Sequence, residues 1–153
     1  MAEIVKNTVE YYMDRYEAIV KALLSYLDWF DRHAGESGAD SHEEEGTMSF
    51  PVYDSTLLAF IRQVQNSGMV DRNYAYVNSR RSLHGWQDEL AFIERAQLAD
   101  MDDLWAILCG YVMEGMTRGS VWSDGVRHRI FYSVIRKMND LLVMWSKEAT
   151  AVR

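Results

Sequence analysis

The residues best suited to bind a ligand lie close together in the last third of this sequence. Arg118, Trp122 and Arg127 all fall within the stretch TRGSVWSDGVR. Guanidinium groups bind carboxylates and phosphates through paired hydrogen bonds, and the free amides at the start of a helix attract the same anions. The stretch therefore indicates a pocket for a small molecule or a phosphate-bearing ligand.

Arg127 matters most for this interpretation. If residues 123–145 form one continuous helix, Arg127 lies on the apolar stripe that faces the core, whereas Arg129 points outward. A cation directed inward must find a partner. Two roles stay open: a structural arginine, snorkelling or paired with an acid of the N-terminal helix, or a pocket residue beside Arg118 and Trp122.

Two histidine–aspartate pairs have the spacing of one helix face, His84 with Asp88 and Asp124 with His128. If the pairs met in space, they could hold a metal ion. However, His84 lies in the turn before its helix, and an acid at position 124 is favoured at a helix start by the helix dipole alone. We therefore expect no metal and no other cofactor.

Nucleophilic catalysis is not indicated either. Ser123 and Asp124 are neighbours on a helix and point apart, so they cannot both address His128 as a catalytic triad would require. The sequence has no phosphate loop, dinucleotide fingerprint or Gly-x-Ser-x-Gly elbow. These observations predict a protein that is not an enzyme.

The elements that would position these residues are helices. Apolar residues recur at steps of three and four, and the only extended piece expected is at residues 48–53. Either Asp54, beside Tyr53, or Ser55 is a candidate N-cap for the helix that follows. We predict an all-α fold, one compact domain over residues 1–153 with five or six helices packed as antiparallel neighbours. The expected helices cover residues 3–32, 55–67, 71–78, 86–100, 104–113 and 123–145.

One segment interrupts the helical pattern. Residues 33–47 include HAGESGADSHEEEG, in which alanine is the only apolar residue type. Glycine, serine and acidic residues cannot bury enough apolar surface to order a segment. We therefore predict an acidic mobile loop over residues 33–47 within the domain.

Composition limits the class of protein further. A chain of 153 residues suits one domain, and its single cysteine, Cys109, excludes an internal disulfide and a cysteine-based zinc site. The longest apolar run, residues 104–113, is too short to span a bilayer, and the first residues do not resemble a signal peptide. We expect a cytoplasmic protein without membrane contact.

Charge is unevenly distributed along the chain. Residues 1–46 hold 4 basic and 11 acidic groups, whereas residues 115–153 hold 7 basic and 3 acidic groups. A pI near 5.0 argues against direct DNA binding, and an acidic surface can steer a basic partner. The partner would be a protein or ribonucleoprotein complex, with a homodimer as an alternative. The candidate acidic interface comprises Asp28, Asp31, Glu43, Glu44, Glu45, Asp102 and Asp103, with Asp14 and Glu17 beside them.

Five segments occur in an order that resembles a known family. They are FPVYD, LLAFIRQVQNSGMVDRNY, AQLADMDDLWAIL, TRGSVWSDG and VIRKMNDLL, within residues 48–142. The family comprises small, uncharacterised bacterial and phage-associated helical proteins. In these proteins a Tyr-Asp pair precedes a helix, and an Arg-Gly-x-x-aromatic-x-x-Gly segment joins two later helices. Tyr53 with Asp54, and Arg118, Gly119, Trp122 and Gly125, are the matching residues here, whereas Ser120 stands where members often have an acid.

The resemblance implies a mobile-element setting and no established activity. Small acidic phage proteins often act by binding and blocking a bacterial defence complex. The expected function is therefore that of an accessory protein which inhibits a nucleic-acid-handling defence complex, in the manner of an anti-CRISPR protein. The alternative is a regulatory protein that binds a small molecule or phosphate ligand. Its candidate pocket residues are Arg118, Trp122, Arg127, Tyr53 and Asp54.

Overall fold

The computed structural model describes residues 9–35, 39–42, 50–118 and 120–151, and these are dominated by helices, as predicted. The described ranges contain more helices than the five or six expected, because the first and last predicted helices are each divided. The α-helices are α1 (Val9–Leu23), α2 (Leu27–Arg32), α3 (Ser55–Gln65), α4 (Ala75–Arg81), α5 (Trp86–Arg95), α6 (Met101–Glu114), α7 (Val121–Arg127) and α8 (Ile130–Ala151).

The first predicted helix is divided by a tighter turn. The segment Leu24–Tyr26 is a 3₁₀ helix that separates α1 from α2. Ser25 lies in this turn, and its hydroxyl bonds back to the carbonyl of Ala22 at 3.4 Å. Serine side chains that bond to the preceding turn bend helices, which the apolar spacing alone does not reveal. The division directs α2 toward the start of α8, against which it packs.

The last predicted helix is also divided, and this changes the interpretation of the motif before it. Helix α7 ends at Arg127, and Arg129 has a left-handed φ of 62°. A residue in this conformation cannot continue a right-handed helix. The stretch expected to be a joint between two helices is therefore itself mostly helix α7, and α8 begins afresh at Ile130.

A short antiparallel ribbon lies between α2 and α3. Strand β1 (Ala39–His42) pairs with β2 (Phe50–Tyr53), with Ala39 opposite Tyr53 and His42 opposite Phe50. β2 agrees with the extended piece predicted at residues 48–53, whereas β1 falls in the predicted loop, so that prediction was wrong for these four residues. Its pairing depends on the partner strand and not on its own sequence. Residues 36–38 and 43–47 of the predicted loop lie outside the described residues.

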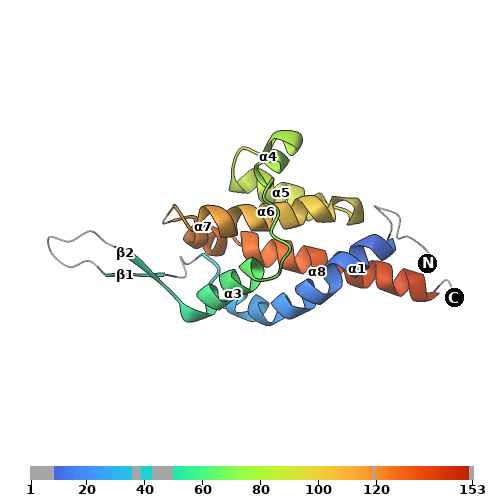
Figure 1. Ribbon diagram of the computed structural model, residues 1–153, viewed down its shortest axis with the longest axis horizontal. Coiled ribbons are helices and arrows are strands. Elements are labelled where there is room, and N and C mark those ends of the chain that lie inside the picture. Colours follow the sequence, from blue (N-terminus) through green and yellow to red (C-terminus); the bar gives the residue numbers. More distant parts are fainter. Residues whose placement is uncertain (1–8, 36–38, 43–49, 119, 152–153) are drawn as a thin grey trace.

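Helix α8 forms the centre of the molecule. Helix α1 runs alongside it in the opposite direction, and α6 crosses the same core (Figure 1). Aromatic rings of α2, α3 and α8 pack together in this core. The ring centroid of Phe30 lies 4.9 Å from that of Phe60 and 5.7 Å from that of Phe131. Helix α6 is buried on most of its surface, including Leu104, Trp105, Ile107, Leu108 and Val112. The first and last helices are therefore held together across the whole length of the sequence.

Helices α4 and α5 form a smaller layer at the top of Figure 1, above α6. The short helix predicted at residues 71–78 begins later, at Ala75, because Asp71 instead accepts a hydrogen bond from the amide of Asn73 and forms a turn. Helix α4 packs on α6, and α5 packs on α8. In the described ranges no helix has both the length and the apolar character needed to cross a membrane.

Candidate functional site

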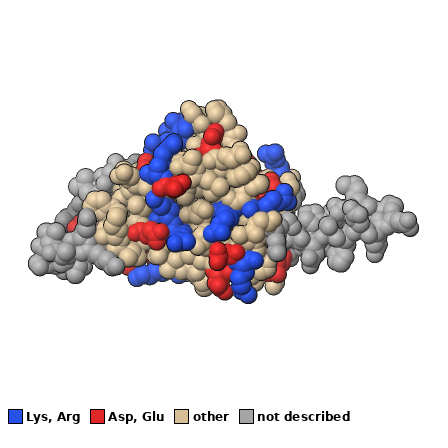
Figure 2. Space-filling model, turned by 180° about the vertical axis from the view of Figure 1, so that it is seen from behind, with Lys and Arg blue, Asp and Glu red and all other residues tan. Residues whose placement is uncertain are grey.

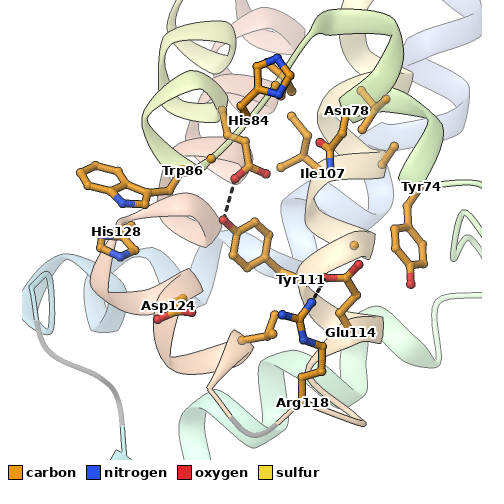
Figure 3. A pocket seen from close by; sticks show the side chains of 17 residues that line it. Tyr74, Asn78, His84, Trp86, Ile107, Tyr111, Glu114, Arg118, Asp124 and His128 are labelled. Carbon is orange, nitrogen blue, oxygen red and sulfur yellow. Dashed lines mark hydrogen bonds and ion pairs between the residues drawn. The ribbon is translucent and has the colours of Figure 1, made fainter.

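A pocket of about 530 Å³ opens where α4, α5, α6 and α7 meet (Figure 3). This volume lies within the range of small-molecule sites in proteins. Its apolar floor includes Ile107 and Gly110 of α6, and Tyr74 stands beside Gly110 at one wall. A Cβ atom at position 110 would lie 3.1 Å from the Tyr74 ring, so glycine allows this ring to approach α6 closely.

Helical spacing places the polar and aromatic groups of the pocket in pairs. Residues three or four apart on a helix project from the same side. Each of α5 and α6 contributes two residues three apart, and α7 and its C-cap contribute two residues four apart. These pairs are Trp86 with Glu89, Tyr111 with Glu114, and Asp124 with His128.

The start of α5 is fixed by local hydrogen bonds. The backbone amide of His84 donates to the Asp88 carboxylate at 2.9 Å, which satisfies a free amide before the first turn. Leu83 is buried and anchors the chain just before it. Trp86 is consequently held at the first position of the helix, with its ring 38% exposed at the edge of the pocket.

Trp86 and His128 form a stacked pair across two helices. Their ring centroids are 4.2 Å apart and their planes are inclined by only 5°. His128 is the C-cap of α7, so the turn at Arg129 that ends α7 also places this imidazole. Figure 3 shows the two rings side by side at one rim of the pocket. The pair offers a flat, rigid surface that links α5 to α7.

Glu89 and Tyr111 meet in the middle of the pocket. The Tyr111 hydroxyl donates to the Glu89 carboxylate at 2.8 Å (Figure 3). Burial raises the pKa of Glu89, and the hydrogen bond from Tyr111 partly opposes this rise. Burial and the nearby Glu89 carboxylate also raise the pKa of Tyr111. The tyrosine therefore stays protonated and acts as a donor at neutral pH.

The remaining charged groups lie near the rim. Arg118 is 3.8 Å from Glu114, and Asp124 is 3.9 Å from Arg127, nitrogen to oxygen. All four side chains are at least 40% exposed. Exposed pairs of this kind contribute between about zero and 1 kcal/mol to stability. They leave the rim charges available to a ligand at little energetic cost.

The structure does not bring the predicted ligand residues together. Of the five candidate ligand residues, Arg118 lines the pocket. Trp122 donates its indole N–H to the carbonyl of Val112 at 3.0 Å and covers Gly115, which gives it a packing role. Asp54 is exposed and caps α3 through the amide of Thr56 at 2.8 Å, as its sequence position predicted. Tyr53 belongs to strand β2, which lies at the left end of Figure 1, away from α4 and α5.

Arg127 is not directed into the core, so the inward orientation expected from a continuous helix was wrong. Its side chain is 47% exposed, and its neighbours Gly125 and Val126 are the buried residues of this turn. Because α7 ends at Arg127, the helical phase of α8 does not apply to it. Gly125, the last residue of the segment expected to join two helices, lies within α7 against Phe131, where a Cβ atom would clash with the ring.

The predicted acidic interface divides into three parts. Asp28 and Asp31 of α2 are exposed and lie 3.2 Å from Arg32 and 3.5 Å from Arg129, respectively. Glu43, Glu44 and Glu45 lie outside the described residues. Asp14 is exposed on α1, and Glu17 is paired with Lys21 on the same helix.

Asp102 and Asp103 do not form an unpaired acidic surface. Asp102 accepts from Tyr16 and lies 3.5 Å from Arg15. Asp103 is buried and binds both Arg80 and Arg81. On the face shown in Figure 2, basic and acidic side chains lie next to one another. Asp102 and Asp103 are thus neutralised by basic side chains within the fold.

The two histidine–aspartate pairs do approach one another, since His84, Asp124 and His128 all line the pocket. However, Asp88 caps the backbone of His84 instead of contacting its imidazole. Across the ranges that the structure describes, no group of three or more histidine, cysteine, aspartate or glutamate side chains has the geometry to hold a metal ion.

The central residues of the pocket, Glu89 and Tyr111, were not identified from the sequence. Trp86 and Tyr111 recur at helical spacing with apolar residues, and such a pattern gives no information about a neighbour on another helix. The available signal was the spacing Trp86–Glu89 and Tyr111–Glu114, an aromatic residue followed three positions later by an acid on two successive helices.

Comparison with protein-family models, curated proteins and solved structures gave no match to this chain. The resemblance to a family of small phage-associated proteins therefore stays a prediction from the sequence. The function must be argued from the geometry of the site.

Proposed function

We propose that this protein is a non-enzymatic binding protein that holds a small, ring-bearing molecule in the pocket between α4, α5, α6 and α7. The observation that carries the proposal is the stacked pair of Trp86 and His128 at the edge of a pocket whose centre holds Glu89 and Tyr111. Small-molecule sites combine flat apolar surface with a few directed polar groups, and this pocket has both.

Binding is favoured over catalysis by the environment of the imidazoles. A histidine that acts as a general base is normally oriented by a hydrogen bond to a carboxylate or hydroxyl group. In the described part of the chain, the side chains of His84 and His128 have no such hydrogen bond, and His128 instead stacks on Trp86. The ring of His128 is therefore better suited to contact a ligand than to transfer a proton.

Another hollow, of about 790 Å³, borders residues 68–73 and offers less to a ligand. Its side chains Arg15 and Arg80 are paired with Asp102 and Asp103, respectively. Since these charges already neutralise one another within the fold, a ligand would have to break existing ion pairs to gain new ones.

A variant in which a large side chain fills the pocket provides the test. Asn78 of α4 is exposed and lines the pocket, whereas its neighbour Ser79 is exposed and does not. We expect small aromatic probes to raise the melting temperature of the wild type and of Ser79→Trp, but not of Asn78→Trp. A probe at about 100 times its Kd stabilises by about 2.7 kcal/mol, or about 5–10 °C for a chain of this size. Equal shifts in both tryptophan variants would overturn the proposal.

Association with a bacterial defence complex remains a separate proposal, supported by the resemblance of the sequence and by the exposed acids of α2. Asp28 and Asp31 are 81% and 59% exposed in their side chains. Reversal of both charges, Asp28→Lys with Asp31→Lys, should weaken capture of a purified defence complex. Unchanged capture would count against an acidic docking surface.

A further inference from the structure

The charge of the pocket argues for a particular class of ligand. Three carboxylates line it (Glu89, Glu114 and Asp124), against a single guanidinium, that of Arg118. The exposed rim pairs Arg118–Glu114 and Arg127–Asp124 largely balance one another, which leaves Glu89 as the pocket carboxylate without a nearby cation among the described residues. An anionic or phosphate-bearing ligand would meet net repulsion here, whereas a cation would be attracted.

Glu89 is the carboxylate best placed to bind such a cation. Glu89 is half-buried. Among the described residues, the one hydrogen-bond partner of its carboxylate is the Tyr111 hydroxyl, and no arginine or lysine lies within ion-pair distance of it. A partly buried carboxylate without a cation is unfavourable, and the raised pKa of Glu89 is consistent with this. A positively charged ligand would supply the missing partner.

The spacing of Trp86 and Glu89 sets the shape of that ligand. Residues three apart on a helix have Cβ atoms about 5–6 Å apart. A ring on the Trp86 side of the pocket and an ammonium group beside Glu89 can therefore belong to one small molecule. Aromatic faces also attract cations, so the rim and the carboxylate act in the same direction.

We infer that the pocket recognises an aromatic amine, with the ammonium group bound by Glu89 and the ring placed against Trp86 and His128. This inference rests on the proposed function and specifies its ligand. Tyr111 is a positioning residue here, because its hydroxyl holds the Glu89 carboxylate in place.

Three probes with one ring system and different charges provide the test: tryptamine, indole-3-acetate and 3-methylindole. Titration calorimetry at pH 7 compares the wild type with Glu89→Gln and with Glu94→Gln. Glu94 lies on the same helix, is exposed and does not line the pocket, so it is a matched control. Because glutamine keeps the size and an acceptor oxygen, the Tyr111 hydrogen bond can persist in Glu89→Gln.

We expect tryptamine to bind more tightly than either other probe, and Glu89→Gln to weaken it about ten-fold or more while Glu94→Gln leaves it unchanged. Circular dichroism and melting curves establish that each variant is folded. If 3-methylindole or indole-3-acetate binds as well as tryptamine and Asn78→Trp abolishes that binding, the inference fails and the proposed function stands. If none of the three binds the folded wild type, both fail.

Discussion

The hydrogen bond between Tyr111 and Glu89 should be measurable as a pH-dependent contribution to stability. In Tyr111→Phe the ring and its packing remain, but a half-buried carboxylate loses the donor that lies 2.8 Å away. Hydrogen bonds to charged groups contribute about 1.5–3 kcal/mol. We therefore expect the free energy of unfolding at pH 7 to fall by about 2 kcal/mol, and the melting temperature to fall by about 4–8 °C.

The sign of the pH dependence follows from the pKa of Glu89. Burial raises this pKa in the folded state, so the contribution of Glu89 favours folding below its ordinary pKa and is lost as the pH rises through the folded-state value. The Tyr111 hydrogen bond lowers the pKa again, and its removal raises the pKa further. The loss in Tyr111→Phe should therefore be largest at pH 7 and shrink as Glu89 becomes protonated.

Other charged groups also affect the pKa of Glu89, and all four variants of the experiment below retain them. Asp88 and Glu114 raise its pKa, and His84, Asp124 and His128 line the same pocket. Urea unfolding of the wild type, Tyr111→Phe, Glu89→Ala and the double variant at several pH values isolates the coupling between the two residues, because alanine removes the acceptor of the hydrogen bond. A coupling energy near zero, or a loss in Tyr111→Phe that is independent of pH, would refute this account of the pair.

Three further predictions concern the elements around the site. Gly125→Ala places a Cβ atom in a steric clash with the buried Phe131 ring, so we expect a loss of about 1–3 kcal/mol in urea unfolding; no loss would mean that α7 shifts freely. Arg127→Ala removes an exposed ion pair and should change stability by less than about 1 kcal/mol in the same assay, whereas a larger loss would indicate an inward arginine after all. Burial raises the pKa of Cys109 to about 11, so its thiol should react slowly with iodoacetamide at pH 8 in the folded protein and rapidly in urea; fast reaction of the folded protein would contradict its burial.

The sequence predicted helices well because apolar periodicity is a local property. The apolar stripe of α3 buries Leu57, Ile61 and Val64, while Leu58 is only half-buried, and Asp54 is the N-cap of that helix. The boundaries inside the first and last helices were missed, since a serine back-bond and one left-handed residue determine them. Such features alter the phase of every later residue in the helix.

The pocket could not be predicted in the same way because its contacts join distant segments. The Trp86–His128 stack spans α5 and α7, and the Glu89–Tyr111 bond spans α5 and α6. The sequence-based interpretation of Arg118, Trp122 and Arg127 relied on closeness along the chain. In the fold, the three side chains take separate directions, and only Arg118 among them reaches the pocket.

The most direct test of the ligand pocket is a titration of ¹⁵N-labelled protein with tryptamine, followed by amide chemical shifts. Our account predicts the largest changes at Gly85, Gly110 and His128, which surround the pocket from three helices or their ends. It also predicts that these changes disappear in Asn78→Trp and persist in Ser79→Trp. Shifts centred on another surface, or the same shifts in both variants, would contradict it.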